Sequence, residues 1–307
     1  MTQRRRDRES GLPIVPVIFG PTCSGKTALA LELAQCAERV EIVSADSRQI
    51  YLGMDIGTAK PSRQERSIAP HHFIDIVTPD TLYSAGRYAA EARACIADIL
   101  ERGGAPLVVG GSGFYIKALF EGLSAPTADP AVLERLAERG EREGYAALYE
   151  ELIRVDPQAA ATHSPNNHVK TLRALGCYYQ TGMPYSSWLA SEGLPAAAFV
   201  PAYHGIAPPR ERLYANINAR VHRMLTEGLL DEVRALLAAG QDADAPGLRT
   251  VGYAEALRYL RGELDLETMT ALIQQSTRRY AKRQMTWFRR VENVRWMEQG
   301  SVEAVAL

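Results

Sequence analysis

GPTCSGKT at residues 20–27 decides the fold of this chain of 307 residues. It fits the pattern Gly-x-x-x-x-Gly-Lys-Ser/Thr, whose glycines let successive backbone N–H groups point into one concavity. An apolar run at 14–19 precedes it and predicts a buried strand, and the segment 28–34 that follows predicts a helix. A helix N-terminus after such a turn forms a cradle for a polyphosphate. Lys26 would contact phosphate oxygens, and the Thr27 hydroxyl would hold Mg²⁺.

Further strands are predicted around this turn. The run 40–45 predicts a second strand that ends at Asp46, and 106–109 predicts a short buried strand that ends in two glycines. A helix is expected over 88–100 and another strand over 71–77. Alternating strands and helices predict an α/β fold with a parallel sheet and helices on both faces, in which ligands lie beyond the carboxyl ends of the strands.

The segment 126–195 differs in its sequence pattern from the rest, because it has helical periodicity, charged faces and no β-branched runs. It is expected to form an all-helical insertion domain in a P-loop NTPase-like core made of 13–125 and 196–307. Within the core, 199–206 predicts a strand that returns to the sheet before further helices. Residues 1–12 carry four arginines with no apolar run behind them, which predicts a disordered basic N-terminus.

The composition, 46% hydrophobic and 23% charged, is that of a soluble globular enzyme. The net charge of −1 means that any surface for a nucleic acid must be a local patch. The four cysteines lack the spacing of a metal site or a disulfide framework, so scattered thiols in a reducing compartment are expected. No run of about 18 apolar residues occurs, so no membrane span is expected. These features favour a cytoplasmic monomer.

Asp46 stands where the second strand ends beside the phosphate loop, where an Asp could simply cap the turn. Its carboxylate also has two possible chemical roles. It could hold Mg²⁺ through water, or it could accept a proton from the attacking group of a substrate. Ser112, in GGSGFY at 110–115, offers a hydroxyl and an N–H to a ligand. Lys60, in MDIGTAKP at 54–61, is a second possible partner for phosphate.

The strongest local excess of charge lies at 278–290, where six basic residues occur with no acidic one. Positions 279, 282, 283, 286 and 290 fall on one face of a helix. A charged helix exposed to solvent usually carries both signs, whereas a basic face with interleaved aromatic residues suits the backbone of a nucleic acid. The run therefore favours an RNA-binding surface.

Together these segments resemble the tRNA dimethylallyltransferase family, or tRNA isopentenyltransferases, in its bacterial form. The matching motifs, in the family's order, are GPTCSGKT at 20–27, DSRQIY at 46–51, MDIGTAKP at 54–61, HHFIDI at 71–76, YSAGRY at 83–88, GGSGFYIKAL at 110–119, RTVGYAEA at 249–256 and AKRQMTWFRR at 281–290. The last two discriminate, since a phosphate loop alone would fit many kinases. The zinc finger of eukaryotic members has no counterpart in the cysteine pattern.

The resemblance implies a reaction. The family transfers a dimethylallyl group from dimethylallyl diphosphate to N6 of adenosine 37, just 3′ of the anticodon, in tRNAs that read codons beginning with U, and diphosphate leaves. The phosphate loop and Mg²⁺ at Thr27, the one cofactor expected, would stabilise the departing negative charge. Asp46 would be the general base for the amine. Ser112 stands where the family more often has Thr, and Arg220 resembles a family arginine that closes on the diphosphate.

The same match implies the residues of the site. Those for the diphosphate are Gly20, Pro21, Thr22, Cys23, Ser24, Gly25, Lys26 and Thr27, and those for catalysis are Asp46, Ser112 and Arg220. Those expected to contact the anticodon stem-loop of tRNA are Asp46, Ser47, Arg48, Gln49, Val169, Lys170, Thr171, Leu172, Arg173, Arg249, Thr250, Val251, Gly252, Tyr253, Ala254, Lys282 and Arg283. The insertion domain is therefore expected to contact tRNA.

Three other activities share some of these features. A P-loop kinase would have the same loop and sheet, but it needs neither a bare basic helix nor a long helical insertion. A prenyltransferase that acts on free adenine nucleotides needs no extended positive surface. A non-enzymatic RNA-binding P-loop protein has no use for Asp46 beside the loop.

Overall fold

The computed structural model describes residues 11–122, 128–190, 197–297 and 305. The chain divides into two compact units, one formed by Met1–Ile116 with Ala198–Leu307 and the other by Lys117–Ala197. The boundaries expected at 125–126 and 195–196 lie outside the described residues, as does the N-terminal segment up to residue 10.

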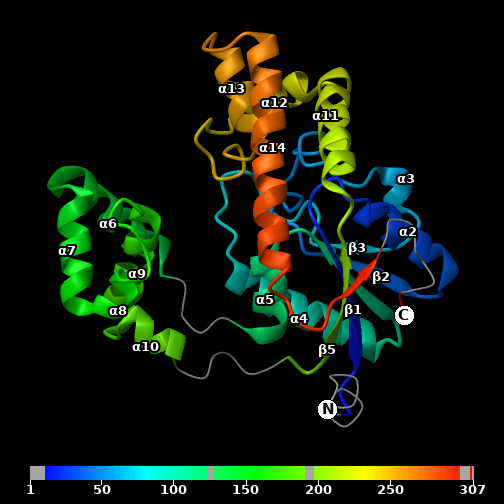
Figure 1. Cartoon of the computed structure of the whole chain (residues 1–307), viewed down its shortest axis with the longest axis horizontal. Coiled ribbons are helices and arrows are strands. Elements are labelled where there is room, and N and C mark those ends of the chain that lie inside the picture. Colours follow the sequence, from blue (N-terminus) through cyan, green and yellow to red (C-terminus); the bar gives the residue numbers. More distant parts are fainter. Residues whose placement is uncertain (1–10, 123–127, 191–196, 298–304, 306–307) are drawn as a thin grey trace. The chain divides into compact units, whose positions relative to one another are not determined.

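The larger unit is built on a six-stranded parallel sheet with the order β3-β2-β4-β1-β5-β6 (Figure 1). Its strands are β1 (Ile14–Phe19), β2 (Val40–Ser44), β3 (His71–His72), β4 (Ala105–Gly110), β5 (Val200–Ile206) and β6 (Arg295–Met297). The α/β fold is confirmed, and the strand expected over 199–206 does join the sheet, beside β1.

The helices of this unit are α2 (Lys26–Cys36), α3 (Arg63–Arg66), α4 (Ala85–Glu101), α11 (Arg210–Thr226), α12 (Leu229–Ala238), α13 (Tyr253–Leu260) and α14 (Leu266–Phe288), and the division at residue 116 falls within α5 (Gly113–Glu121). On one face of the sheet Ile18 and Ile42 pack against α2. Glu41 points to the opposite face and pairs with Arg102 at the end of α4, 2.8 Å between Oε1 and Nη1. Helices therefore cover both faces, which is why the strands are almost wholly apolar.

The four C-terminal helices form a second hydrophobic cluster with the segment that follows β2. Met54 from that segment is buried with Met224 of α11, Leu229 of α12 and Met269 of α14. Figure 1 shows α11 to α14 gathered at the carboxyl edge of the sheet. The buried side of the segment after β2 thus packs against these helices.

The strand expected over 71–77 is wrong beyond its first two residues. Phe73 and Asp75 have φ of 63° and 57°, in the left-handed region, so the extended backbone cannot continue past His72. Pairing returns only in an isolated bridge between Tyr51 and Val77. The short edge strand β6 was not predicted, since three residues carry too little pattern to be recognised.

The second unit is helical throughout its described residues, with α6 (Pro130–Glu143), α7 (Tyr145–Val155), α8 (Pro157–Ala160), α9 (His168–Thr181) and α10 (Tyr185–Ala190). Leu136, Leu148 and Leu175 meet in its core. Asp156 joins two of the helices, because its Oδ1 accepts the Ala159 N–H of α8 at 2.9 Å and its Oδ2 accepts the Ser186 N–H of α10 at 2.7 Å. In neither unit does a described helix combine the length and the apolar character needed to cross a membrane.

Candidate active site

Three strand ends meet at the carboxyl edge of the sheet. β4 lies between β1 and β2 and pairs with both, with Phe19 beside Gly110. Ser112 donates its N–H to Ala45 O at 3.0 Å, which puts Ser112 next to the residue before Asp46. A Cβ on Gly110 would lie 2.1 Å from Ala45 O, so only glycine allows this close approach. The sheet therefore brings the phosphate loop, Asp46 and Ser112 to one edge.

Residues 20–27 form the tight turn that the motif predicts. Cys23 and Gly25 have φ of 63° and 92°, which turns the backbone from β1 into α2. The Ser24 hydroxyl is buried and has no hydrogen-bond partner among the described residues. Four amides of the turn also donate to no backbone carbonyl in the described part of the chain, those of Cys23, Gly25, Lys26 and Thr27. Unpaired donors at a helix N-terminus suit an anion.

Lys26 lies inside this turn and is folded back on it. Its Nζ donates to Pro21 O at 2.7 Å. Burial of the ammonium lowers the pKa of Lys26 to about 8, while the charges of Asp46 and Cys23 act in the opposite direction and that of Arg220 adds to the decrease. A bound anion would favour the charged form of the lysine and restore its pKa.

Side chains from two distant helices hold the phosphate loop. From α11, Arg220 donates through Nη1 to the Thr22 hydroxyl at 2.7 Å, and Asn216 donates through Nδ2 to Cys23 O at 3.3 Å. From α14, Gln284 Oε1 accepts the Thr22 N–H at 2.9 Å. The structure thus places Arg220 at the loop, as expected, and adds two contacts that the sequence did not predict.

Asp46 is half-buried beside the loop. Its Oδ1 accepts the N–H groups of Arg48 at 2.8 Å and Gln49 at 3.4 Å, whereas its Oδ2 accepts none from the described residues. Its negative charge acts on Lys26, and it adds to the increase of the Tyr280 pKa to about 12, which burial of the phenol mainly causes. One carboxylate oxygen is therefore fixed by the backbone and the other is left for a ligand.

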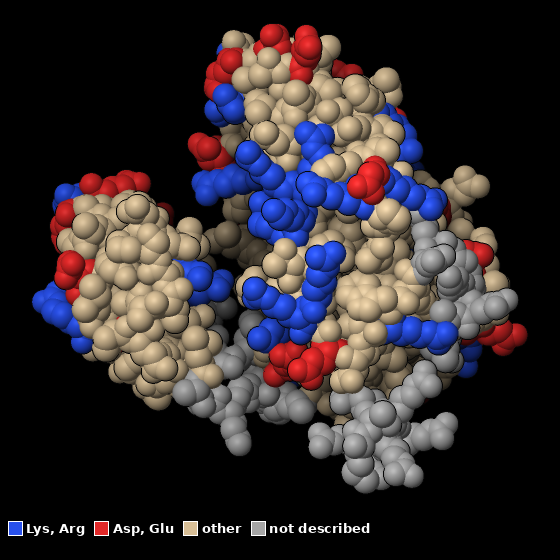
Figure 2. Space-filling view, in the orientation of Figure 1, with Lys and Arg blue, Asp and Glu red and all other residues tan. Residues whose placement is uncertain are grey.

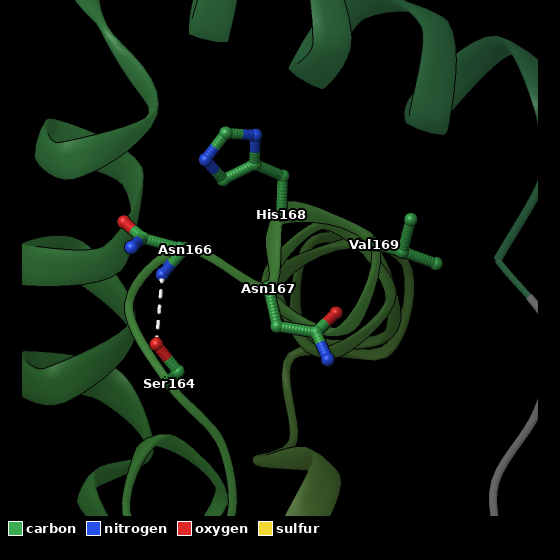
Figure 3. A pocket seen from close by; sticks show the side chains of 5 residues that line it. All are labelled: Ser164, Asn166, Asn167, His168 and Val169. Carbon is green, nitrogen blue, oxygen red and sulfur yellow. Dashed lines mark hydrogen bonds between the residues drawn. The ribbon is translucent and has the colours of Figure 1, made fainter.

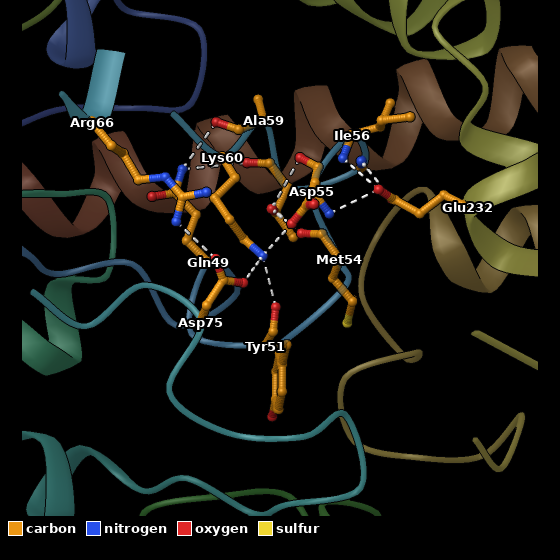
Figure 4. Close-up of polar contacts among 12 residues, drawn as sticks. Gln49, Tyr51, Met54, Asp55, Ile56, Ala59, Lys60, Arg66, Asp75 and Glu232 are labelled. Atoms are coloured by element: carbon orange, nitrogen blue, oxygen red, sulfur yellow. Dashed lines mark hydrogen bonds and ion pairs between the residues drawn. The ribbon is translucent and has the colours of Figure 1, made fainter. Parts of the chain in front are cut away.

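Lys60 does not serve as a second phosphate partner, and that interpretation of the sequence is wrong. Its Nζ donates to Tyr51 O at 2.8 Å, and it lies 2.5 Å from Oδ1 of both Asp55 and Asp75 (Figure 4). The side chain is 1% exposed. Three acceptors satisfy the three ammonium donors, so Lys60 stabilises the segment 51–61 and has no donor left for phosphate.

Glu232 of α12 binds the segment 51–61 from its other side, at residues 55–57. Its Oε2 accepts the N–H groups of Asp55 and Ile56, both at 2.8 Å (Figure 4). Its Oε1 accepts the Gly57 N–H at 3.2 Å and the Tyr253 hydroxyl at 2.5 Å. A Cβ on Gly57 would lie 2.3 Å from the Tyr253 ring, so this contact also requires glycine. One carboxylate therefore joins the loop to α12 and α13.

The segment 249–254, expected to contact tRNA, is mostly internal. Arg249 is exposed, Val251 and Ala254 are half-buried, and Thr250, Gly252 and Tyr253 are buried. Thr250 donates its hydroxyl to Gly247 O at 2.6 Å, which shapes the turn before α13. Arg249 is thus the residue of this segment whose side chain is available at the surface.

The basic run lies on α14 and just past its end, and its charged face is exposed. Figure 2 shows Lys and Arg side chains gathered over this helix. The exposed basic residues are Arg279, Lys282, Arg283, Arg289 and Arg290. The opposite side of the helix is buried, where Phe288 stacks on Phe19 with ring centroids 4.5 Å apart. The basic face therefore belongs to a helix packed against the end of β1, directly before the phosphate loop.

In the second unit, the expected RNA contacts start at the first turn of α9. Val169, Lys170 and Arg173 are exposed, Leu172 is half-buried, and Thr171 is buried and lies 3.2 Å from His163 Nε2 through its hydroxyl. A hollow of about 420 Å³ opens beside this turn (Figure 3), lined by Ser164, Asn166, Asn167, His168 and Val169. This surface offers amide groups next to the charge of Lys170.

The residues at the loop fit Mg²⁺ of the kind that is bound mainly through substrate. Among the described residues, no group of three His, Cys, Asp or Glu side chains could form a protein cage for a metal. The Thr27 hydroxyl and the Asp46 carboxylate are oxygen donors, which Mg²⁺ prefers, and this ion commonly uses one or two protein ligands together with phosphates and water.

Sequence reasoning missed three residues that hold loops at the site, Gln284, Glu232 and Asn216. For Gln284 a signal existed, because it lies three residues after Ala281 and four before Phe288, on the apolar side of an otherwise basic helix. A polar residue at such a position is buried and needs partners. Nothing in the sequence marks Glu232 among the many acidic residues of the chain.

Known tRNA dimethylallyltransferases are similar to this chain over nearly its whole length. A family model described as IPP transferase matches residues 49–291. The tRNA dimethylallyltransferase 1 of Pelobacter propionicus is 46% identical over 288 residues, which cover 94% of this chain and 93% of the relative. The tRNA dimethylallyltransferase of Salinibacter ruber is 47% identical over 281 residues, with 91% and 86% covered.

Solved structures of tRNA prenyltransferases are also similar to this chain. The crystal structure of the full-length tRNA isopentenylpyrophosphate transferase from Bacillus halodurans is similar with a TM-score of 0.67 and 37% identity, covering 94% of this chain and 90% of that one. A eukaryotic dimethylallyltransferase acting on tRNA is similar with a TM-score of 0.80 and 27% identity, covering 95% and 75%.

Proposed function

The chain belongs to the IPP transferase family and is a tRNA prenyltransferase, and from this premise we propose its reaction. It transfers a dimethylallyl group from dimethylallyl diphosphate to N6 of adenosine 37, 3′ of the anticodon. The acceptors are tRNAs that read codons beginning with U. The observation that carries the proposal is the combination of an anion cradle at 20–27, the carboxylate of Asp46 and a basic helix within one unit. A kinase would need the cradle and the carboxylate but not the basic helix.

We propose that the phosphate loop holds the diphosphate as the leaving group. The unpaired amides of Cys23, Gly25, Lys26 and Thr27, the Ser24 hydroxyl and the ammonium of Lys26 are donors in a partly buried turn, where they stabilise developing negative charge strongly. Arg220, which contacts Thr22, adds a second positive charge. Mg²⁺ bound by the Thr27 hydroxyl would neutralise further charge on the diphosphate.

Asp46 is proposed as the general base. The N6 amine forms a bond to the allylic carbon while the carbon–oxygen bond to diphosphate breaks, and the proton lost by N6 goes to a carboxylate oxygen. Oδ1 of Asp46 is occupied by backbone N–H groups, so we propose that Oδ2 accepts the proton. Ser112, adjacent through Ala45, would orient the base or the diphosphate with its hydroxyl.

RNA binding is proposed for the exposed members of the expected set. In the larger unit these are Arg249, Lys282 and Arg283, together with the half-buried turn at 47–49. In the second unit they are Val169, Lys170 and Arg173, beside the hollow at the start of α9. Basic side chains on one face neutralise phosphates, and the target base must leave its stack, which costs least in a loop. We propose a monomer that acts in the cytoplasm.

The test is an acceptor assay with radiolabelled dimethylallyl diphosphate. Unmodified tRNA with adenosine at position 37 should take up label in a Mg²⁺-dependent reaction. The same tRNA with guanosine at position 37 should take up none, because it has no N6 amine. Label in AMP but not in tRNA would instead identify a prenyltransferase of free nucleotides. Formation of ADP from ATP without prenyl transfer would identify a kinase.

A further inference from the structure

Gln284 is a buried polar residue of α14, and its side-chain amide joins two parts of the candidate active site. Its Oε1 accepts the Thr22 N–H at 2.9 Å, and its Nε2 donates to Gly111 O, also at 2.9 Å. The residue is 7% exposed. A single amide therefore ties the phosphate loop to the turn after β4.

The surroundings leave this amide little freedom. A Cβ on Gly111 would lie 2.4 Å from Gln284 Nε2, so the missing side chain is what lets the amide approach. One turn further along α14, Trp287 packs so closely on Gly113 that a Cβ there would lie 2.4 Å from the indole. Phe288 is fully buried in the same helical turn. Packing on both sides fixes the position of Gln284 relative to the loop.

The hydrogen bond to Gln284 divides the donors of the phosphate loop into two sets. The Thr22 N–H already has a protein acceptor, so it is not available to a ligand. The amides of Cys23, Gly25, Lys26 and Thr27 have no carbonyl partner and are available. The start of the loop is therefore anchored to α14, while the donors that remain free are those closest to the N-terminus of α2.

Resting on the function proposed above, we propose that Gln284 is a positioning residue for the diphosphate. It holds Thr22 so that the following amides converge on one anion, and it holds Gly111 so that Ser112 stays beside Asp46. It contacts no substrate itself. Donors that are already oriented need no reorganisation when charge develops on the leaving group, so loss of this tether affects diphosphate binding and turnover. The exposed basic face of α14 does not depend on it.

The first experiment replaces Gln284 by Met, which has a similar length and shape but neither hydrogen bond. The Kd for inorganic pyrophosphate with Mg²⁺ is measured by calorimetry, the KM for dimethylallyl diphosphate by prenyl transfer, and the Kd for tRNA by filter binding. We expect the pyrophosphate Kd and the KM to rise roughly 10- to 100-fold, as for other small misplacements of binding groups. The tRNA Kd should stay within about twofold, within the usual range for a substitution away from the contact.

A matched control is Asn218→Leu. Asn218 accepts a hydrogen bond from Arg278 Nη1 at 2.7 Å, so this change removes a different polar contact of α14, the one to α11, without touching the phosphate loop. It should leave the pyrophosphate Kd unchanged. An equal rise in both variants would attribute the effect to helix packing and overturn the proposal, as would a Gln284→Met protein with the wild-type pyrophosphate Kd.

The second experiment needs no variant. In the native protein, amide hydrogen exchange followed by NMR should show the Thr22 N–H protected before any ligand is added and little changed by pyrophosphate. The amides of Cys23, Gly25, Lys26 and Thr27 should gain protection on pyrophosphate binding. A Thr22 amide that becomes protected only with pyrophosphate would overturn the proposal. A native protein that neither binds pyrophosphate nor prenylates tRNA would instead contradict the proposed function.

Discussion

Replacing Tyr253 by Phe removes one hydroxyl from the interior, and we expect it to lower stability while RNA affinity stays unchanged. The ring is fully buried, and the hydroxyl donates to Glu232 Oε1 at 2.5 Å. Hydrogen bonds to charged groups contribute about 1.5–3 kcal/mol to the free energy of unfolding. Glu232 is half-buried and keeps the Gly57 N–H on the same oxygen, so water would recover part of the loss. The expected cost is therefore about 1–2 kcal/mol.

The assay is urea unfolding followed by circular dichroism, with Tyr253→Phe, Glu232→Gln and the double variant arranged in a cycle. The two residues are in contact, so their effects should not add, and a coupling energy of about 1 kcal/mol is expected. Filter binding of tRNA is measured in parallel at a temperature where all four proteins are folded. The tRNA Kd of Tyr253→Phe should equal that of the wild type.

One combination of results would refute this reasoning. A change in the free energy of unfolding below about 0.5 kcal/mol, the range of ordinary surface substitutions, would mean that the hydroxyl has no buried partner. If the tRNA Kd rose at the same time, Tyr253 would contact RNA directly. Arg249→Ala serves as the comparison, because its exposed side chain should affect tRNA binding and not stability.

Three further expectations concern the substrates. Asp46→Ala should lower single-turnover prenyl transfer roughly 10²–10⁴-fold with a nearly unchanged tRNA Kd, as for loss of a general base; a collapse of tRNA affinity would make it a binding residue instead. Replacing both Lys282 and Arg283 by Ala should weaken tRNA binding and reduce the slope of log K against log salt by up to about 1.8, since each phosphate contact contributes roughly 0.7–0.9; an unchanged slope would mean that these charges only face solvent. The pKa of Lys26 is about 8 in the free protein and a bound anion raises it, so pyrophosphate affinity should be full below about pH 8 and should fall as pH rises through that value. Calorimetry of pyrophosphate binding at about pH 9, in two buffers of different ionisation enthalpy, should then detect proton uptake. Lys26→Arg should abolish this uptake. If the wild type took up no proton, Lys26 would not be the group that is protonated when the anion binds.

Elements with a strong local pattern were predicted closely. The strand expected over 14–19 is β1 to the residue, the one over 40–45 is one residue longer than β2, and the one over 106–109 is one residue shorter than β4 at each end. Buried parallel strands are continuous apolar runs, and here each ends in glycine or polar residues, so both their presence and their limits can be recognised. The helix over 88–100 was found but begins earlier, at Ala85, because Ser84 accepts the Arg87 N–H and caps it.

Elements whose conformation depends on distant partners were predicted less well. HHFIDIV alternates enough to suggest a strand, yet the positive φ of Phe73 and Asp75 ends it. Asp75 then pairs with Lys60 and Arg66, contacts that only the folded loop creates. The same ion pairs explain why Lys60 lies buried among acceptors, although a lysine beside a phosphate loop suggests a phosphate partner.

What the sequence determined by itself was the α/β class, the position of the phosphate loop, and the motifs that match the family, since each depends on residues close together along the chain. Only the tertiary structure decided which groups hold that loop. Gln284 is 262 residues from Thr22, and Glu232 is 175 residues from Gly57. Partners so far apart have no mutual signal in a single sequence, because the packing of helices on the sheet alone selects which polar group meets which unpaired amide.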